Sequence, residues 1–159
     1  MIAIAPPPPV TSLVAVGACP PAGAHLVEVG IEGFRRRVGK VRVRLFGGAP
    51  STYFDKHQAL VRVEVPVPAA GPVRLCLAAP GPGVYALDVR HDLNGNGKTD
   101  RQDGGGASGN PHMSLLDVLF SRKPSPASVQ FRVGAGTTGV PVVLTYLQGG
   151  SFERVPDGG

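Results

Sequence analysis

The chain has few aromatic side chains and no long apolar run. Its 159 residues include no tryptophan, and only 6% of them are aromatic. Because the bases of single-stranded nucleic acid stack on aromatic rings, we expect no nucleic-acid partner, even though the net charge is +5. No apolar run approaches the roughly 20 residues that a membrane-spanning helix needs, so no membrane span is predicted.

Charged residues are also scarce, at 17% of the chain, whereas hydrophobic residues make up 42%. A chain with so little charge and so many apolar side chains is expected to fold rather than to remain disordered. Its 23 glycines and 17 prolines exclude long helices as the main element, because both residues interrupt helices. Sheets joined by tight turns tolerate both residues, so the composition favours one all-β domain.

Alternation of apolar and polar residues marks the expected strands. In one segment Val41, Val43 and Leu45 alternate with Arg42 and Arg44, as is typical of a sheet with one buried face. Turns rich in glycine and proline separate such segments. We predict a seven-stranded antiparallel β-sandwich of immunoglobulin or transthyretin type, with a small barrel as the alternative. The seven predicted segments are 25–31, 41–45, 61–67, 73–77, 85–89, 129–133 and 142–146.

Residues 1–24 form a proline-rich leader before the predicted sandwich. Four prolines, Pro6–Pro9, interrupt its apolar residues, whereas a signal peptide has an unbroken apolar stretch. We interpret the leader as an incomplete signal segment, which a start codon placed too late or a lost signal would explain. The sandwich is predicted to cover residues 25–148, with an ordered loop that lacks a clear strand at 91–126, and residues 149–159 are predicted to form a flexible tail.

The strongest local signal is a run of oxygen-bearing side chains in the first part of this loop. They occupy positions 1, 3, 5, 9 and 12 of a twelve-residue segment, with a glycine at position 6 and a backbone carbonyl at position 7. This is the spacing by which a single loop surrounds calcium. Position 12 is an aspartate rather than the longer glutamate, so we expect a modest affinity, with a Kd of roughly 0.1 to 1 mM. The predicted ligands are Asp92, Asn94, Asn96, Lys98, Asp100 and Asp103.

An alternative interpretation of the same residues needs no ion. The segment contains two Asn-Gly pairs, which are strong turn formers. Hydrogen bonds from the asparagine side chains to the neighbouring backbone would then hold the turn. The residues Gly97-Lys98-Thr99 also imitate the end of a phosphate-binding loop, but no helical pattern follows them and Asp92 stands at the position of the first glycine. A phosphate site is therefore rejected.

Cys19 and Cys76 are the only cysteines. Cys76 is expected on the face of its strand opposite Leu75 and Leu77, where a bridge from the leader would attach the N-terminal segment to the sheet. In an oxidising compartment we predict a Cys19–Cys76 disulfide, which would stabilise the fold by roughly 4 kcal/mol. Two alternatives remain open: a pair of free thiols, or a lipoprotein cleavage box that ends at Cys19, in which case Cys76 would be unpaired.

No catalytic constellation is evident in the sequence. Ser108 lies in a segment that lacks the second glycine of a nucleophile elbow, so no Ser/His/Asp triad can be assembled around it. The histidines lack the close spacing of zinc ligands, so no zinc site is predicted. These histidines are His25, His57, His91 and His112.

Two motifs in the second half of the chain point to a family. They are His91-Asp92-Leu93-Asn94-Gly95-Asn96-Gly97-Lys98 and the segment Gly106-Ala107-Ser108-Gly109-Asn110. In this order they resemble a bacterial secreted family known as domain of unknown function 2141, and the resemblance covers about residues 19–150. Its second motif normally reads Gly-Phe-Ser-x-Asn, so Ala107 replaces an aromatic residue and a looser loop is expected. The resemblance implies export and the fold, but no activity.

From these features we predict an exported, non-enzymatic module of the periplasm or cell surface, with a binding or structural role and calcium as its cofactor. An envelope protein or a polysaccharide is the expected kind of partner, and the sequence specifies neither ligand nor oligomeric state. One alternative is a hydrolase with its site in loop 91–112, using Asp92 or Asp103 as base and His91 or His112 as acid.

A second alternative is a protein that binds anionic surfaces, either lipid or polysaccharide. It would use the run Arg35-Arg36-Arg37 together with Arg42 and Arg44. We interpret the run of three arginines as the solvated tip of a hairpin instead, because a short cluster of like charges is most often a solvated surface.

Overall fold

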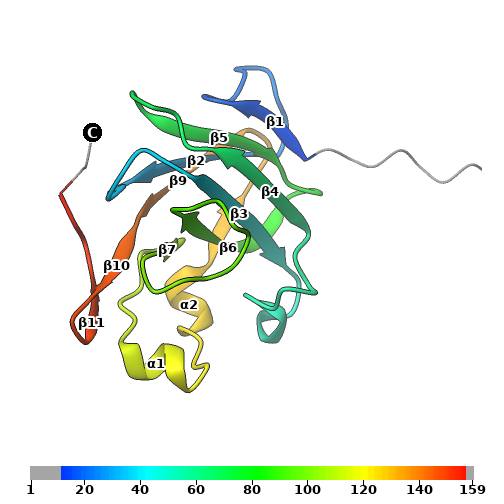
Figure 1. Cartoon of the computed structure of the whole chain (residues 1–159). Coiled ribbons are helices and arrows are strands. Elements are labelled where there is room, and N and C mark those ends of the chain that lie inside the picture. Colours follow the sequence, from blue (N-terminus) through cyan, green and yellow to red (C-terminus); the bar gives the residue numbers. More distant parts are fainter. Residues whose placement is uncertain (1–11, 157–159) are drawn as a thin grey trace, which may run out of the picture.

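The structure is a computed structural model that describes residues 12–156, arranged as two β-sheets packed face to face (Figure 1). The prolines Pro6–Pro9 of the predicted leader lie outside the described residues. The predicted β-sandwich is confirmed, and the alternative of a small barrel is not what the chain forms. Among residues 12–156, none of the helices has the length and apolar character needed to cross a membrane.

The first sheet, sheet A, contains four strands. Its order is β1-β5-β2-β9, and β2 pairs with β9 in parallel while the other pairs are antiparallel. No tight turn joins β2 to β9, since most of the chain lies between them, so nothing forces the two strands to run in opposite directions. The strands are β1 (Leu13–Val16), β5 (Val73–Ala78), β2 (Leu26–Glu32) and β9 (Thr137–Val143).

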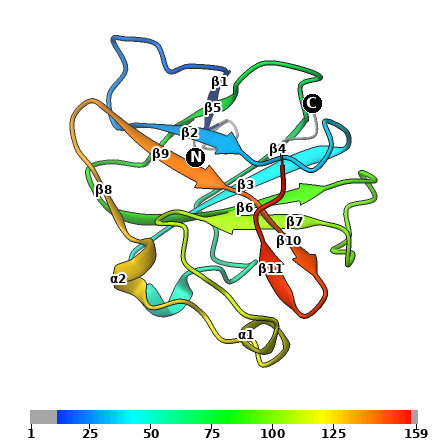
Figure 2. The same ribbon diagram turned by 90° about the vertical axis from the view of Figure 1, so that its left-hand side faces the viewer.

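The second sheet, sheet B, has seven strands in the order β11-β10-β7-β6-β3-β4, with β8 paired to the first residues of β6. Three short helical segments, η1, α1 and α2, lie on the side of sheet B that faces away from sheet A (Figures 1 and 2). The strands are β3 (Lys40–Gly47), β4 (Val61–Pro66), β6 (Gly83–Asp92), β7 (Gly104–Ala107), β8 (Phe131–Val133), β10 (Thr145–Gln148) and β11 (Ser151–Glu153). The helical segments are η1 (Pro50–Thr52), α1 (Leu115–Leu119) and α2 (Pro126–Val129).

The main core fills the space between the two sheets. The alternation predicted in β3 is present, because Val41, Val43 and Leu45 are fully buried there. They pack in one cluster with residues of sheet A such as Val29 and Leu75. Complete burial of an aliphatic side chain contributes about 1.5 to 3 kcal/mol, so this cluster is the principal source of stability.

A smaller apolar cluster lies on the opposite, outer face of sheet B. Phe46 follows Leu45 in β3 and therefore points away from the main core, as does its register partner Ala86 in β6. Tyr53 from the η1 segment and Val129 from α2 cover this pair. The outer face of sheet B is thus partly covered by chain, and it provides surfaces on which a cavity can form.

The predicted number and limits of the strands need correction. Residues 12–156 form eleven strands rather than the seven predicted. Strand β1 lies within the predicted leader 1–24, β11 lies within the predicted flexible tail 149–159, and β7 lies within the loop 91–126 that was expected to lack a strand. Strand β7 reads Gly-Gly-Gly-Ala, so it has no apolar alternation by which sequence reasoning could recognise it.

The predicted disulfide joins Cys19 to Cys76, and no free cysteine remains. Cys76 lies on β5 and is fully buried, and Ala15 of β1 is its register partner. The backbone N–H of Cys19 also donates a 2.8 Å hydrogen bond to Glu28 of β2. The disulfide and the pairing of β1 with β5 therefore attach the N-terminal segment to the edge of sheet A, and the alternatives of free thiols or an unpaired Cys76 do not describe the structure.

Reduction of this disulfide is expected to destabilise the fold by roughly 4 kcal/mol in the chain-entropy model, because the bridge closes a loop with a sequence separation of 57. Urea unfolding with and without reductant measures the difference. The double variant Cys19→Ala/Cys76→Ala serves as the control, since its midpoint should not respond to reductant. Equal midpoints for reduced and oxidised wild type would contradict the prediction.

Candidate functional site

The predicted metal ligands lie in the connection of a β-hairpin. Asp92 is the last residue of β6, and Asp103 immediately precedes β7. The two strands are antiparallel, with His91 opposite Gly104, so the ends of the connection are held next to each other. We call residues 92–103 the aspartate loop. The hairpin explains how residues eleven positions apart in sequence come to share one site.

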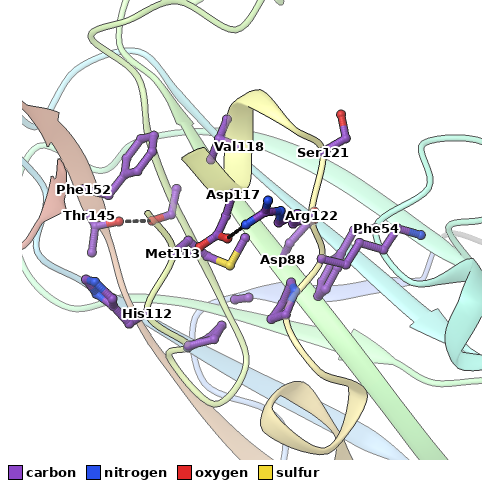
Figure 3. A pocket seen from close by; sticks show the side chains of 16 residues that line it. Phe54, Asp88, His112, Met113, Asp117, Val118, Ser121, Arg122, Thr145 and Phe152 are labelled. Atoms are coloured by element: carbon purple, nitrogen blue, oxygen red, sulfur yellow. Dashed lines mark hydrogen bonds and ion pairs between the residues drawn. The ribbon is translucent and has the colours of Figure 1, made fainter. Parts of the chain in front are cut away.

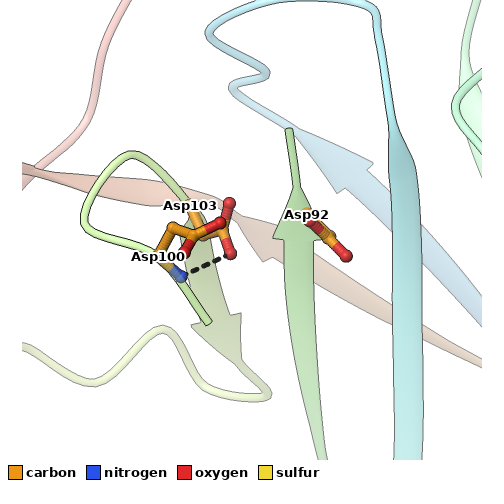
Figure 4. A group of neighbouring side chains, drawn as sticks. All are labelled: Asp92, Asp100 and Asp103. Atoms are coloured by element: carbon orange, nitrogen blue, oxygen red, sulfur yellow. Dashed lines mark hydrogen bonds between the residues drawn. The ribbon is translucent and has the colours of Figure 1, made fainter. Parts of the chain in front are cut away.

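Three carboxylates meet in the aspartate loop (Figure 4). Asp92, Asp100 and Asp103 each offer one oxygen, and these oxygens lie within 4.8 Å of one another. Asp92 and Asp103 are buried, and Asp100 is partly exposed. This is the one group of three or more acidic, histidine or cysteine side chains that converges in this way among the described residues.

Backbone N–H groups hold the two buried carboxylates in place. Asp92 accepts hydrogen bonds from Gly95 at 3.1 Å and from Gly97 at 2.7 Å. Both glycines have a positive φ, at 67° and 77°, a conformation that glycine adopts without steric cost. Asp103 accepts from the N–H groups of Leu93 at 3.2 Å and Asp100 at 2.9 Å. The loop is therefore ordered around its carboxylates.

The two asparagines contribute differently from the aspartates. The side-chain oxygen of Asn94 accepts from the N–H of Asn96, and that of Asn96 accepts from the N–H of Lys98. Their amide NH₂ groups both donate to Asp100, at 3.0 and 2.9 Å. The asparagine turn bonds of the alternative interpretation are thus present. Coordination by these two residues would require each amide group to turn over, which places its oxygen where its nitrogen now lies.

The backbone hydrogen bonds to Asp92 and Asp103 are compatible with an ion, because each carboxylate oxygen has two lone pairs and a bond from the backbone uses only one of them. Three negative charges within a few ångströms repel one another, and a hard divalent cation with oxygen ligands relieves that repulsion. Arg90 of β6 lies beside the loop and donates to Thr99 at 2.9 Å and to the carbonyl of Gly97 at 3.4 Å. Its guanidinium supplies positive charge next to the loop, and these two bonds go to Thr99 and Gly97 rather than to the three aspartates.

His91 lies next to Asp92 and is completely buried. Its Nε2 is 2.7 Å from the carbonyl oxygen of Val38, and its Nδ1 is 2.6 Å from the hydroxyl of Tyr146. A carbonyl can only accept, so Nε2 carries the proton, and Nδ1 of the neutral ring accepts from Tyr146. The ring also makes an edge contact with Phe34 at 5.1 Å between centroids. The two ring nitrogens therefore connect β6 to Val38, which precedes β3, and to Tyr146 in β10.

Burial lowers the pKa of His91 below its usual value of 6.5, since a charged ring would lose its hydration. The hydrogen bond to Val38 and the nearby carboxylates of Asp103 and Asp92 oppose this effect without cancelling it. The ring is thus held neutral in the folded protein, in agreement with the hydrogen-bond pattern.

Ser108 and its neighbours connect separate strands. The Ser108 hydroxyl lies between the backbone of Leu87, whose N–H donates to it at 3.0 Å, and the carbonyl of Val129, to which it donates. The side-chain oxygen of Asn110 accepts a hydrogen bond from the N–H of Val143 at 2.9 Å. The segment 106–110 therefore ties β7 to β6, α2 and β9, a role that the sequence motif alone did not indicate.

The arginines of the predicted anion-binding group lie in different environments. Arg35 stacks over the ring of Tyr146 at 4.8 Å, and Arg37 stacks over Phe34 at 5.2 Å and donates to backbone carbonyls. The prediction of a solvated hairpin tip is therefore wrong for these two half-buried residues, and Arg36 is the exposed member of the run.

The other two arginines, Arg42 and Arg44, lie on the outer face of sheet B. Arg44 forms two hydrogen bonds with Asp88, its register partner, one of them at 2.9 Å. Burial, together with the like charges of Arg44 and Arg90, lowers the pKa of Arg42 to about 10.

A cavity of about 440 Å³ lies over the outer face of sheet B, between β7 and the segment that contains α1 (Figure 3). We call it the outer cavity. Its floor includes Asp88, Gly105 and Ala107, and its wall includes Met113 and Val118. Sequence reasoning missed it, because its lining comes from several separate segments and because two residues of its floor, Gly105 and Ala107, have little or no side chain. Ala107, which replaces the aromatic residue of the motif, is one of them.

One family model matches the chain. It is described as an uncharacterized protein conserved in bacteria, domain of unknown function 2141, and it matches residues 29–140, from within β2 to within β9. The resemblance inferred from the two motifs is therefore confirmed. No curated protein and no solved structure matches the chain.

The neutral His91 predicts how stability depends on pH. Its pKa is lowered in the folded state, so unfolded chains bind a proton more readily below about pH 6.5. Its contribution to the free energy of unfolding is present above that pH and is lost as the pH falls towards the folded pKa. His91→Gln should cost about 1 to 3 kcal/mol at neutral pH, because buried partners lose a hydrogen bond, and should flatten the slope between about pH 7 and pH 5. Urea unfolding across that range measures both effects.

His57→Gln provides the control, since His57 is exposed and outside the core. It should leave both the stability at neutral pH and the slope unchanged. A slope that is identical in wild type and His91→Gln would show that another group controls acid sensitivity.

Proposed function

The chain belongs to the bacterial family of domain of unknown function 2141, and from that premise we propose that it is an exported, non-enzymatic β-sandwich module that binds calcium in its aspartate loop. Its role is to bind or support another component of the bacterial envelope. The observation that carries the calcium proposal is the convergence of Asp92, Asp100 and Asp103 within 4.8 Å.

The donor set supports calcium over other common cations. The candidate ligands are carboxylates, amides and one carbonyl, which are the oxygen donors that calcium prefers, and no histidine or cysteine belongs to the converging group. Calcium also accepts flexible geometry with six to eight ligands, so a loop held by glycine turns can adapt to it. Magnesium requires a more regular octahedron and releases its water reluctantly.

The disulfide supports the proposed location outside the cytoplasm. Disulfides form and persist in oxidising compartments such as the periplasm, whereas thiols in the cytoplasm are kept reduced. Cys19–Cys76 closes a long loop and its Cys76 half is buried, so it is built into the sandwich rather than exposed for exchange.

The surroundings of the candidate catalytic groups support a binding role over the hydrolase alternative. Both nitrogens of His91 are engaged in buried hydrogen bonds, and the Ser108 hydroxyl is engaged by backbone. His112 lines the outer cavity, whose lining includes neither Asp92 nor Asp103. An acid and base pair drawn from these residues would therefore not face one substrate.

Calcium is expected to stabilise the folded protein by mass action. At about 10 mM calcium and a Kd of roughly 0.1 to 1 mM, the stabilisation is about 1.4 to 2.7 kcal/mol. Asp100→Asn should abolish most of it, since the variant loses one ligand charge but keeps an oxygen that accepts from Asn94 and Asn96. Thermal melting during a calcium titration measures the effect.

Asp55→Asn is the matched control for this experiment. Asp55 is exposed and lies outside the aspartate loop. Its carboxylate accepts a hydrogen bond from the backbone N–H of His57. This variant should respond to calcium as wild type does. A wild-type melting temperature that does not move with calcium would leave the asparagine turn as the whole explanation of the loop.

The non-enzymatic proposal predicts no turnover of esterase, glycosidase, phosphatase or peptidase substrates. The assay compares wild type with His112→Ala, Asp103→Ala and Asp92→Ala, which remove one acid candidate and both base candidates of the hydrolase alternative. Turnover by wild type that any of these substitutions removes, while the circular dichroism spectrum is retained, would overturn the proposal.

A further inference from the structure

The outer cavity has the size and lining of a ligand site. Its volume of about 440 Å³ lies in the usual range for small-molecule sites, roughly 300 to 1,000 Å³. We propose that the outer cavity binds a small apolar molecule that carries one anionic group. The inference does not depend on calcium, since no residue of the aspartate loop lines the cavity.

The floor of the cavity is open because of one glycine. In β7 the glycines at 104 and 106 face the main core, and a Cβ there would lie 2.5 Å from the Tyr146 ring or 2.7 Å from Val142. Gly105 points the other way, into the cavity, where the nearest atom to a Cβ would be the Val89 carbonyl oxygen at 3.6 Å. Core packing therefore requires glycine at 104 and 106 but not at 105. The missing side chain at 105 leaves the space above the sheet empty.

Apolar side chains surround this space and would contact the body of a ligand. Phe54 follows η1 and lies at one side, Met113 and Val118 come from the α1 segment, and Phe152 comes from β11 (Figure 3). The Val118 side chain is 51% exposed. A bound apolar molecule would remove part of this surface from water, at about 25 cal/mol for each Å² buried.

The acids that line the cavity are already engaged. Asp88 accepts two hydrogen bonds from Arg44, and their charges offset each other. Asp117 accepts from the backbone N–H and the hydroxyl of Ser114, both at 2.9 Å, in a capping box at the start of α1. These bonds lower the pKa of Asp117, so it remains a satisfied carboxylate. Neither acid calls for a cationic ligand.

Two cations at the cavity lack an equivalent partner. Lys123 donates to the carbonyl oxygen of Ser51, which leaves its charge uncompensated. Arg122 is 64% exposed, stacks on Phe120, and approaches Asp117 only to 3.9 Å, which is a weak surface pair. Arg44 offsets the charge of Asp88, so Asp117, Arg122 and Lys123 together leave one net positive charge at the cavity. An anionic group on the ligand complements it.

Two probes with the same ring system test the proposal. Anilinonaphthalene sulfonate carries a sulfonate and becomes fluorescent in apolar sites, and N-phenylnaphthylamine is the same ring system without the sulfonate. The chain has no tryptophan, so dye fluorescence can be excited without interference from that residue. We expect saturable one-to-one binding of the sulfonate, and weaker binding of the neutral amine by roughly threefold to fivefold, the effect of an exposed charge pair.

Variants locate the site. Gly105→Leu should weaken both probes by roughly tenfold or more, because leucine fills the floor of the cavity. The double variant Arg122→Gln/Lys123→Gln should weaken only the sulfonate, towards the affinity of the amine. Gly139→Leu is the matched control: it lies in β9, is exposed, and a Cβ there meets nothing within 4 Å. Its binding should equal that of wild type.

Folding of each variant is checked by circular dichroism and thermal melting, and Ala107→Phe replaces Gly105→Leu if the latter does not fold. The proposed site would be overturned if the variant that fills the cavity bound the sulfonate as tightly as wild type does. It would also be overturned if Gly139→Leu weakened sulfonate binding as much as that variant does. Non-saturable binding by wild type would do the same. Equal affinity of wild type for the two probes would overturn the anionic preference.

Discussion

The buried hydrogen-bond chain through His91 is the interaction on which the arrangement of the aspartate loop depends. Its ring joins the end of β6 to Val38 in the β2–β3 connection and to Tyr146 in β10. The Tyr146 hydroxyl in turn accepts a hydrogen bond from the backbone N–H of Arg35 at 3.2 Å. The residue after this histidine is Asp92, so the same chain fixes the point at which the aspartate loop leaves the sheet. A loop of glycines and asparagines needs such a rigid base to bring its carboxylates together.

Glycine has two distinct uses in the β6–β7 hairpin. In the aspartate loop, Gly95 and Gly97 adopt positive φ values and turn their N–H groups towards Asp92. In β7, glycine lets the strand approach Tyr146 and Val142 on one face and leaves open space on the other. A single hairpin thereby supplies both the candidate ion site at its tip and the floor of the outer cavity along its length. The two candidate sites share this hairpin but no residues.

The sequence predicted those features that depend on local pattern. Alternation identified the two-sheet architecture, because the apolar residues of strands such as β3 follow a strict period of two. Oxygen spacing identified the aspartate loop, and the pair of cysteines identified the bridge. Strand β7 was missed because three glycines and an alanine carry no pattern. Strand β1 was missed because its partner β5 lies far away in the sequence, and β11 because its three residues are too few to show an alternation. The outer cavity was beyond local reasoning altogether, since Phe54, Gly105 and Phe152 meet only in the folded chain.

The parallel pairing of β2 with β9 constrains the order in which the chain can fold. Leu26 lies opposite Thr137, so this ladder needs residues from near both ends of the domain. The β3–β4 and β6–β7 pairs, by contrast, join strands that are neighbours in sequence, and they close loops much shorter than the one between β2 and β9. Contacts between distant residues form slowly, because the entropy of closing a long loop is lost before the contact stabilises the chain. The β3–β4 and β6–β7 hairpins are thus positioned to form before the β2–β9 ladder, which closes once β9 has become available.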